Sequence, residues 1–306
     1  MKKLIYMTLL LIILPSITIL IIKPLLKEIE KKEYKFTKNT MVRVKRVNKN
    51  IIETIPLEKY LIGVVGGEMP VSYNIEALKA QAVAARTYTL NKMEINKKNN
   101  FDIVDTTDDQ VYLNDNELKE SWKNKYEEYK TKIEQAIQET RGEYLTYNGK
   151  IIKAFFFSTS SGTTENCKDV FGENLPYLTS VSSTWDENSP SYLSTTTLTK
   201  EEFLKKLEIE YNDNLNIEIE RNDTNSIKEI TINGNKIKGT DFRHKLNLRS
   251  TNIELEEENN SIKIISKGYG HGVGMSQYGA QELANIGYTY DQILKYYYQG
   301  IEIKKI

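Results

Sequence analysis

A run of 19 residues without a charged side chain, Leu4–Ile22, is the feature that most limits what this chain can fold into. As a helix, it would be long enough to cross a bilayer. Lys2 and Lys3 precede it, Lys23 and Lys27 follow it, and no Ala-x-Ala-like site comes after it, which favours an uncleaved anchor over a cleaved signal peptide. Because these charges nearly balance, they do not fix the orientation. A single N-terminal anchor usually leaves the globular body outside the cytoplasm, and we expect that arrangement here.

The chain is therefore expected to have three parts. Residues 1–22 form a short cytoplasmic stub and a transmembrane helix, and the charged residues 23–35 form a stalk. Residues 36–306 form a globular region, with a possible strand-rich subdomain at about 210–260. The expected fold class of this region is α+β, with helices and antiparallel hairpins that form a groove.

Turn and cap residues locate the main elements. A hairpin is predicted around Asn48-Lys49-Asn50, because apolar and polar residues alternate on both sides of it. Two more are predicted at Asn148-Gly149 and Asn233-Gly234, because Asn-Gly pairs adopt the backbone of tight hairpin turns. An Ala-rich stretch, 74–93, has apolar residues at helical spacing and begins with Asn74, a good helix cap. A second helix is predicted from Leu118 to Ile137.

Composition excludes some classes of function. The 42 basic and 42 acidic residues give a net charge of zero, so no nucleic-acid partner is expected. One cysteine, Cys167, rules out an intrachain disulfide. The only histidines, His244 and His271, form no short-range ligand pair with it, so neither a metal site nor another cofactor is predicted. A Cys167–His271 nucleophile pair is conceivable but has no evident third group.

The stretch Gly66-Gly67-Glu68-Met69-Pro70 holds the strongest candidate for chemistry. Glycines let another group approach closely, and Pro70 pushes Met69 out of helical geometry. We therefore expect Glu68 to project from an irregular loop-to-helix junction, a setting that suits a general acid. An incidental charged turn is the alternative.

Two further segments have the composition of a binding loop. Residues 158–166 read Ser-Thr-Ser-Ser-Gly-Thr-Thr-Glu-Asn, which fits either a solvated turn or a loop that binds a polyhydroxyl ligand. Residues 268–274 alternate glycine with other residues but lack phosphate-loop spacing. Their glycines would instead bring His271, Gln277 and Tyr278 close to a ligand.

Glycosidic cleavage needs an acid that protonates the leaving oxygen, and ordinary glycosidases use two carboxylates. Glu165 is a possible second carboxylate for Glu68, but the sequence does not set their separation. Without a nearby second carboxylate, an intramolecular transfer that uses a hydroxyl of the sugar becomes the alternative to hydrolysis.

Together these segments resemble the stage II sporulation protein D (SpoIID) family, similar to lytic transglycosylases of peptidoglycan. The resemblance lies in several separated motifs that occur in order. They are residues 57–61, 63–70, 77–88, 158–165, 175–178 and 271–280.

The resemblance implies cleavage between N-acetylmuramic acid and N-acetylglucosamine that leaves a 1,6-anhydro end, with 36–306 as the catalytic region. It assigns Glu68 as general acid and then base, with Arg86 and Tyr278 as further catalytic candidates. The substrate would contact Ser160, Gly162, Thr163, His271 and Gln277. Zinc, reported for some members, is not expected because no histidine lies near Cys167 in the sequence.

The resemblance also implies partners. The substrate would be glycan strands stripped of peptides by an amidase, and a membrane scaffold protein of the forespore engulfment machinery would be a second partner.

The mechanism makes two physical demands. Glu68 must carry a proton at neutral pH, so burial near Met69 and Val65 should raise its pKa. Because a cation would lower that pKa, Arg86 should contact the glycan, or pair with Glu68 only in the free enzyme. Two alternatives stay open: a glycan-binding module without turnover, and a hydrolase that uses Glu68 and Glu165.

Overall fold

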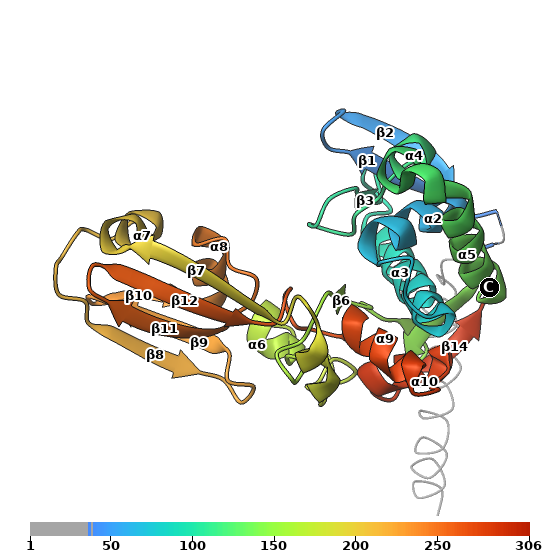
Figure 1. Cartoon of the computed structure of the whole chain (residues 1–306). Helices are drawn as coiled ribbons and strands as arrows, with labels where there is room; N and C mark the ends of the chain where they lie inside the picture. The colour runs from blue at the N-terminus through green and yellow to red at the C-terminus, as the bar shows by residue number, and fades with distance from the viewer. Residues whose placement is uncertain (1–35, 38) are drawn as a thin grey trace, which may run out of the picture. The chain divides into compact units, whose positions relative to one another are not determined.

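A computed structural model describes residues 36, 37 and 39–306. Within these residues, no helix is both long enough and apolar enough to cross a membrane. The predicted anchor, 1–22, and stalk, 23–35, lie outside the described residues. The described part mixes helices with mainly antiparallel sheets, which confirms the α+β fold class (Figure 1).

The long helix α3 (Ile75–Ile95) is the centre of the helical part. The Asn74 side chain caps it as predicted, by accepting a hydrogen bond from the Glu76 N–H at 3.0 Å. Its alanines are completely buried and let neighbouring elements approach closely. Elements from both ends of the sequence pack against it: α2 (Leu57–Glu68), α5 (Tyr126–Glu139), β4 (Glu143–Tyr147), α9 (Gln277–Asn285) and α10 (Tyr290–Tyr297).

Small sheets border these helices. Strand β1 (Met41–Arg46) pairs antiparallel with β2 (Ile51–Pro56), as the first predicted hairpin requires, and parallel with the short β3 (Ile103–Val104). Strand β4 pairs with β5 (Lys150–Ile151) across the Asn148-Gly149 turn and with β14 (Glu302–Lys305). The short strands β6 (Phe156–Phe157) and β13 (Met275–Ser276) pair in parallel, which brings the two predicted binding loops together.

A strand-rich part spans residues 193–267 and has its own apolar core, which includes Phe203, Phe242 and Ile264. It contains two three-stranded sheets, of order β10-β9-β8 and β11-β12-β7, together with two helices. The elements are β7 (Leu193–Thr199), α7 (Lys200–Leu207), β8 (Ile217–Arg221), β9 (Ile227–Ile232), β10 (Asn235–Lys238), α8 (Gly239–Lys245), β11 (Asn252–Glu258) and β12 (Ser261–Lys267). The Asn233-Gly234 turn joins β9 to β10, as predicted.

The second predicted helix is not continuous. It consists of α4 (Asp115–Trp122), the 3-10 turn η1 (Lys123–Lys125) and α5. The break lies at Lys123, whose φ of 51° is incompatible with a right-handed helix. No glycine or proline marks this position, so periodicity alone predicted one helix. The break separates Trp122 from α5.

Candidate active site

Glu68 is the last residue of α2, not a loop residue, which corrects the predicted position of the Gly66-Gly67-Glu68 stretch. The helix ends there because Met69 is extended, with φ −128° and ψ 138°, as expected of a residue before proline. The predicted helix boundary was therefore placed a few residues too early, while the role of Pro70 was correct.

The glycines of α2 have ordinary helical backbones, and close packing against a neighbouring segment explains why they have no side chain. A Cβ on Gly66 would lie 2.6 Å from the Trp122 ring, and one on Gly63 would lie 2.2 Å from the Leu113 carbonyl oxygen. Real Cβ atoms essentially never come that close to another group. The glycines thus allow the 111–122 segment to lie directly against the helix that carries Glu68.

Burial controls the charge of Glu68. Its Oε1 accepts a hydrogen bond from the Val111 N–H at 2.5 Å, which favours the ionised form. Desolvation opposes this and is the larger effect, so the pKa of Glu68 is raised to about 7. The direction agrees with the sequence prediction, and both Val65 and Met69 are buried as expected. Glu68 can therefore hold a proton near neutral pH.

A cavity of about 410 Å³ opens beside Glu68. Its aromatic wall consists of Trp122 and Tyr129, both half-buried, whose rings meet edge to face at 5.8 Å between centroids. Among the described residues that line it, Glu68 carries the only carboxyl group. The lining residues are Gly66, Gly67, Glu68, Met69, Pro70, Val71, Ser72, Trp122 and Tyr129.

Lys132 holds the turn that follows Glu68. From α5, its Nζ donates to the carbonyl oxygens of Val71, at 2.9 Å, and Tyr73, at 2.5 Å. Burial lowers the pKa of Lys132. Sequence analysis did not identify Trp122, Tyr129 or Lys132 as site residues, because their position on helices that pack beside α2 has no local signal.

Arg86 does not take part in this site, and its predicted catalytic role is corrected. Its side chain is fully buried and forms two hydrogen bonds with Glu58, at 2.9 and 2.7 Å, and a third with the Glu143 carbonyl oxygen. Glu58 lies ten positions before Glu68 on α2, which separates their backbones by about 15 Å at the rise of an α-helix. Arg86 therefore ties α3 to the far end of α2.

The predicted binding loop 158–166 is largely internal. Ser160 is 1% exposed, and its hydroxyl donates to Asp186 at 2.7 Å. Ser183 and Ser276 also donate to this carboxylate, at 2.5 and 2.8 Å. Burial raises the pKa of Asp186 to about 6, although the three hydroxyls lower it. This network joins the loop to the start of α9, so Ser160 has a structural and not a substrate-binding position.

Some of the neighbouring predicted residues line a small cavity. Ser160, Thr163 and His271 line a cavity of about 10 Å³, which is room for roughly one water molecule. Gly162 is buried, and its carbonyl oxygen accepts from the Ser183 N–H at 2.8 Å. None of these residues lines the Glu68 cavity, and their contact with substrate stays a prediction.

Gln277 is buried, and His271 is partly buried against aromatic rings. The His271 ring contacts Phe155, Phe157 and Phe171, and burial lowers its pKa to about 4, with the charge of Arg243 adding to the effect. Gln277 is 6% exposed and donates to the Gln81 side chain at 3.4 Å. Both therefore support the glycine-rich segment from within.

Tyr278 does not line the Glu68 cavity, but its ring contacts the turn that follows Glu68. Its hydroxyl donates to the Asn188 carbonyl oxygen at 3.1 Å, and its ring meets the edge of Tyr73 at 6.4 Å. Tyr73 ends the turn that begins after Glu68. Tyr278 thus approaches the site through Tyr73.

Glu165 is not a partner of Glu68. It is 4% exposed and accepts hydrogen bonds from Asn222, Thr224 and Ser226 in the strand-rich part, at 2.5–2.8 Å. It does not line the Glu68 cavity. Burial raises the pKa of the Cys167 thiol to about 11, which does not favour a nucleophile. Over 36–37 and 39–306, no group of three or more His, Cys, Asp or Glu could hold a metal ion.

A desolvated carboxyl group beside two aromatic rings has the features of an acid–base site for a ring-shaped ligand. Comparisons with known proteins agree with the motifs. The SpoIID family model, described as stage II sporulation protein, matches residues 45–147, which include every residue of the Glu68 cavity.

Relatives extend the similarity along the chain. Stage II sporulation protein D of Bacillus amyloliquefaciens is 44% identical over 270 residues, covering 86% of this chain and 78% of that protein. The protein of the same name from Bacillus subtilis (strain 168) is 43% identical and 79% covered. The amidase enhancer of Bacillus subtilis is 29% identical over 299 residues, with 78% of this chain and 39% of that protein covered. The chain belongs to the stage II sporulation protein D family, which confirms the resemblance.

Proposed function

We propose that this protein is a membrane-anchored lytic transglycosylase that cleaves peptidoglycan glycan strands between N-acetylmuramic acid and N-acetylglucosamine. The observation that carries the proposal is Glu68, a carboxyl group with a pKa of about 7 that faces an aromatic-walled cavity. An acid with a pKa near the working pH can both donate and accept a proton efficiently. The rings of Trp122 and Tyr129 supply faces and edges on which a sugar ring packs.

The reaction needs Glu68 twice. Its Oε1 accepts the Val111 N–H, whereas Oε2 has no hydrogen bond within the described residues, so we assign the proton to Oε2. Glu68 gives this proton to the glycosidic oxygen as the C1–O bond breaks. The C6 hydroxyl of the same muramic acid then attacks C1 and returns a proton to the Glu68 carboxylate. A 1,6-anhydro ring forms, and no water is consumed.

The surroundings of Glu68 favour this route over hydrolysis. A retaining or inverting glycosidase needs a second carboxylate within about 10 Å of the first. Glu165, the candidate for that role, is engaged by three donors in a different part of the molecule. An internal hydroxyl nucleophile needs no such second carboxylate.

The wider role rests on family membership. The names of the Bacillus relatives support a function in sporulation, and the name of the amidase enhancer relative supports a link to cell-wall amidases. We propose that the catalytic region, 36–306, acts outside the cytoplasm and is anchored by residues 1–22. Its substrate would be strands stripped of peptides by an amidase, with a membrane scaffold protein as a partner during engulfment.

Mass spectrometry of peptide-free glycan strands digested with the full chain in detergent tests the activity. We expect 1,6-anhydromuramic ends. Reducing muramic ends would instead establish a hydrolase. Glu68→Gln should abolish new ends but keep glycan binding, whereas Glu120→Gln, which changes an exposed glutamate on α4, should leave both unchanged. If wild type binds glycan but produces no new ends, the protein is a binding module.

A further inference from the structure

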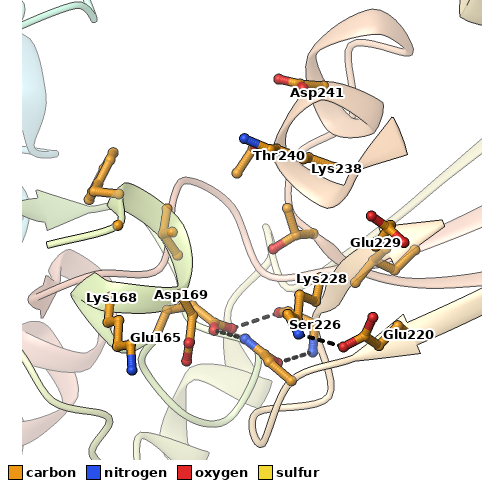
Figure 2. A pocket seen from close by; sticks show the side chains of 16 residues that line it. Glu165, Lys168, Asp169, Glu220, Ser226, Lys228, Glu229, Lys238, Thr240 and Asp241 are labelled. Carbon is orange, nitrogen blue, oxygen red and sulfur yellow. Dashed lines mark hydrogen bonds and ion pairs between the residues drawn. The ribbon is translucent and has the colours of Figure 1, made fainter. Parts of the chain in front are cut away.

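A second and larger cavity, of about 550 Å³, lies between α6 (Cys167–Phe171) and the strand-rich part (Figure 2). Its volume is within the usual range of small-ligand pockets. Lys168 and Asp169 lie on one side, and Lys238, Thr240 and Asp241 lie on the other. None of its lining residues lines the Glu68 cavity, so it is a separate site.

Lys238 differs from the other lysines on strands β7–β12. Each of those, Lys228, Lys236, Lys263 and Lys267, forms an ion pair with a glutamate on a neighbouring strand. The Lys238 side chain lines the cavity and forms no hydrogen bond or ion pair with any described residue, and the same holds for the side chain of Lys168 of α6. The cavity therefore has two exposed cations that the fold does not neutralise.

The carboxylates of the cavity divide into engaged and available groups. Glu220 forms an ion pair with Lys228, and Glu229 forms one with Lys236. Glu165 accepts hydrogen bonds from hydroxyl and amide donors of the 222–226 turn. The Asp241 carboxylate has no hydrogen bond or ion pair with any described residue, and the Asp169 carboxylate accepts a hydrogen bond only from Asn166, at 3.1 Å. Two available carboxylates thus accompany the two available lysines.

The remaining wall is apolar. Phe171 is 43% exposed, which is unusual for a large aromatic side chain, and Val170 and Ile227 lie beside it on the lining. A polyanion such as a nucleotide would face Asp169 and Asp241 as well as the lysines. A ligand with both signs of charge and some apolar surface matches the lysines, the carboxylates and the apolar side chains of the cavity.

We propose that this cavity binds a short peptide that carries both free carboxylates and free amino groups. Its carboxylates would contact Lys168 and Lys238, its amino groups would contact Asp169 and Asp241, and its aliphatic part would cover Phe171. The peptides of the bacterial cell wall have this chemistry. Such a site would let the protein recognise peptides on, or released from, the wall, independently of any cleavage at Glu68.

Isothermal titration with the tripeptide L-Ala-γ-D-Glu-meso-diaminopimelate and the full chain in detergent tests the proposal. We expect saturable binding with a dissociation constant of about 1 mM or tighter. The double variant Lys168→Gln/Lys238→Gln should weaken it at least about tenfold. The matched control Lys205→Gln/Lys206→Gln alters two exposed lysines of α7 outside the cavity and should bind like wild type.

Charge is tested on the ligand as well as on the protein. The same tripeptide with amidated carboxylates and acetylated amines should not bind. Absence of saturable binding by the charged peptide would overturn the proposal. Equal affinity for the two peptides, or unchanged binding by Lys168→Gln/Lys238→Gln with normal circular dichroism, would also overturn it. Because no readout here involves bond cleavage, an inactive enzyme does not affect the result.

Discussion

Glu68 and Asp186 are both buried carboxyl groups whose pKa values burial raises, to about 7 and about 6. Their surroundings differ. Asp186 accepts hydrogen bonds from Ser160, Ser183 and Ser276 and is fully enclosed. Glu68 accepts one, from a backbone N–H, and faces a cavity. A raised pKa therefore does not identify a catalytic acid by itself. Glu68 is the better candidate because one of its oxygens has no hydrogen bond within the described residues and faces space for a ligand.

The largest expected effect is on the rate of glycan cleavage, which should depend on Glu68 but not on Asp186. Glu68→Gln should lower the rate of glycan cleavage by about a thousandfold or more, because the amide cannot donate a proton to the leaving oxygen. Asp186→Asn should lower the free energy of unfolding by about 1–3 kcal/mol, because one hydroxyl donor loses its acceptor. Its folded molecules should cleave at the wild-type rate. A loss of turnover in fully folded Asp186→Asn would break the comparison.

Arg86 is a third buried ionisable residue, and it belongs neither to the Glu68 cavity nor to the Asp186 network. Glu58→Ala leaves its guanidinium buried without its carboxylate, so the free energy of unfolding should fall by about 3–5 kcal/mol. Denaturant unfolding measures this. Glu139→Ala breaks the ion pair with Lys79, in which Glu139 is 43% exposed, and should cost about 1 kcal/mol or less. Similar losses for the two variants would contradict a structural Arg86.

The pH dependence of stability sharpens the role of Glu68. The folded protein binds the Glu68 proton more tightly than the unfolded chain, so the fold loses stability as pH rises from about 4.5 to about 7 and carries the full penalty above that. Glu68→Gln removes this penalty and should raise the free energy of unfolding by about 1–3 kcal/mol at pH 8. The gain should shrink as pH falls from 7 to 4.5 and vanish below that. A gain independent of pH would show that Glu68 is not desolvated.

The activity of the wild type should also depend on the ionisation of Glu68. The rate of cleavage should fall as pH rises through about 7, because Glu68 then loses the proton it donates. A rate that is constant from pH 6 to pH 8 would contradict Glu68 as the acid.

The two tryptophans provide the smallest test. Trp122 lines the Glu68 cavity, whereas Trp185 belongs to the Asp186 region and donates to the Tyr297 hydroxyl at 3.3 Å. Trp122→Ala should weaken glycan binding about tenfold through lost ring contact. Trp185→Ala should leave the affinity unchanged, and isothermal titration calorimetry measures both. Equal effects would mean that the glycan also covers the Asp186 region.

Short-range signals in the sequence located most elements correctly. Turn pairs such as Asn148-Gly149 and caps such as Asn74 act within a few residues, so the hairpin and the start of α3 could be predicted from them. The break at Lys123 could not, because neither a glycine nor a proline marks the residue whose φ is 51°.

The sequence by itself determined the α+β class, the family and Glu68 as the candidate acid, because these depend on local patterns and on motifs read in order. Tertiary structure decided the rest. Arg86, Ser160 and Gln277 have the polarity of site residues, but long-range contacts with Glu58, Asp186 and Gln81 place them inside the protein. Whether a polar side chain meets a ligand or another part of the chain depends on which distant segments pack against it, and local pattern does not contain that information.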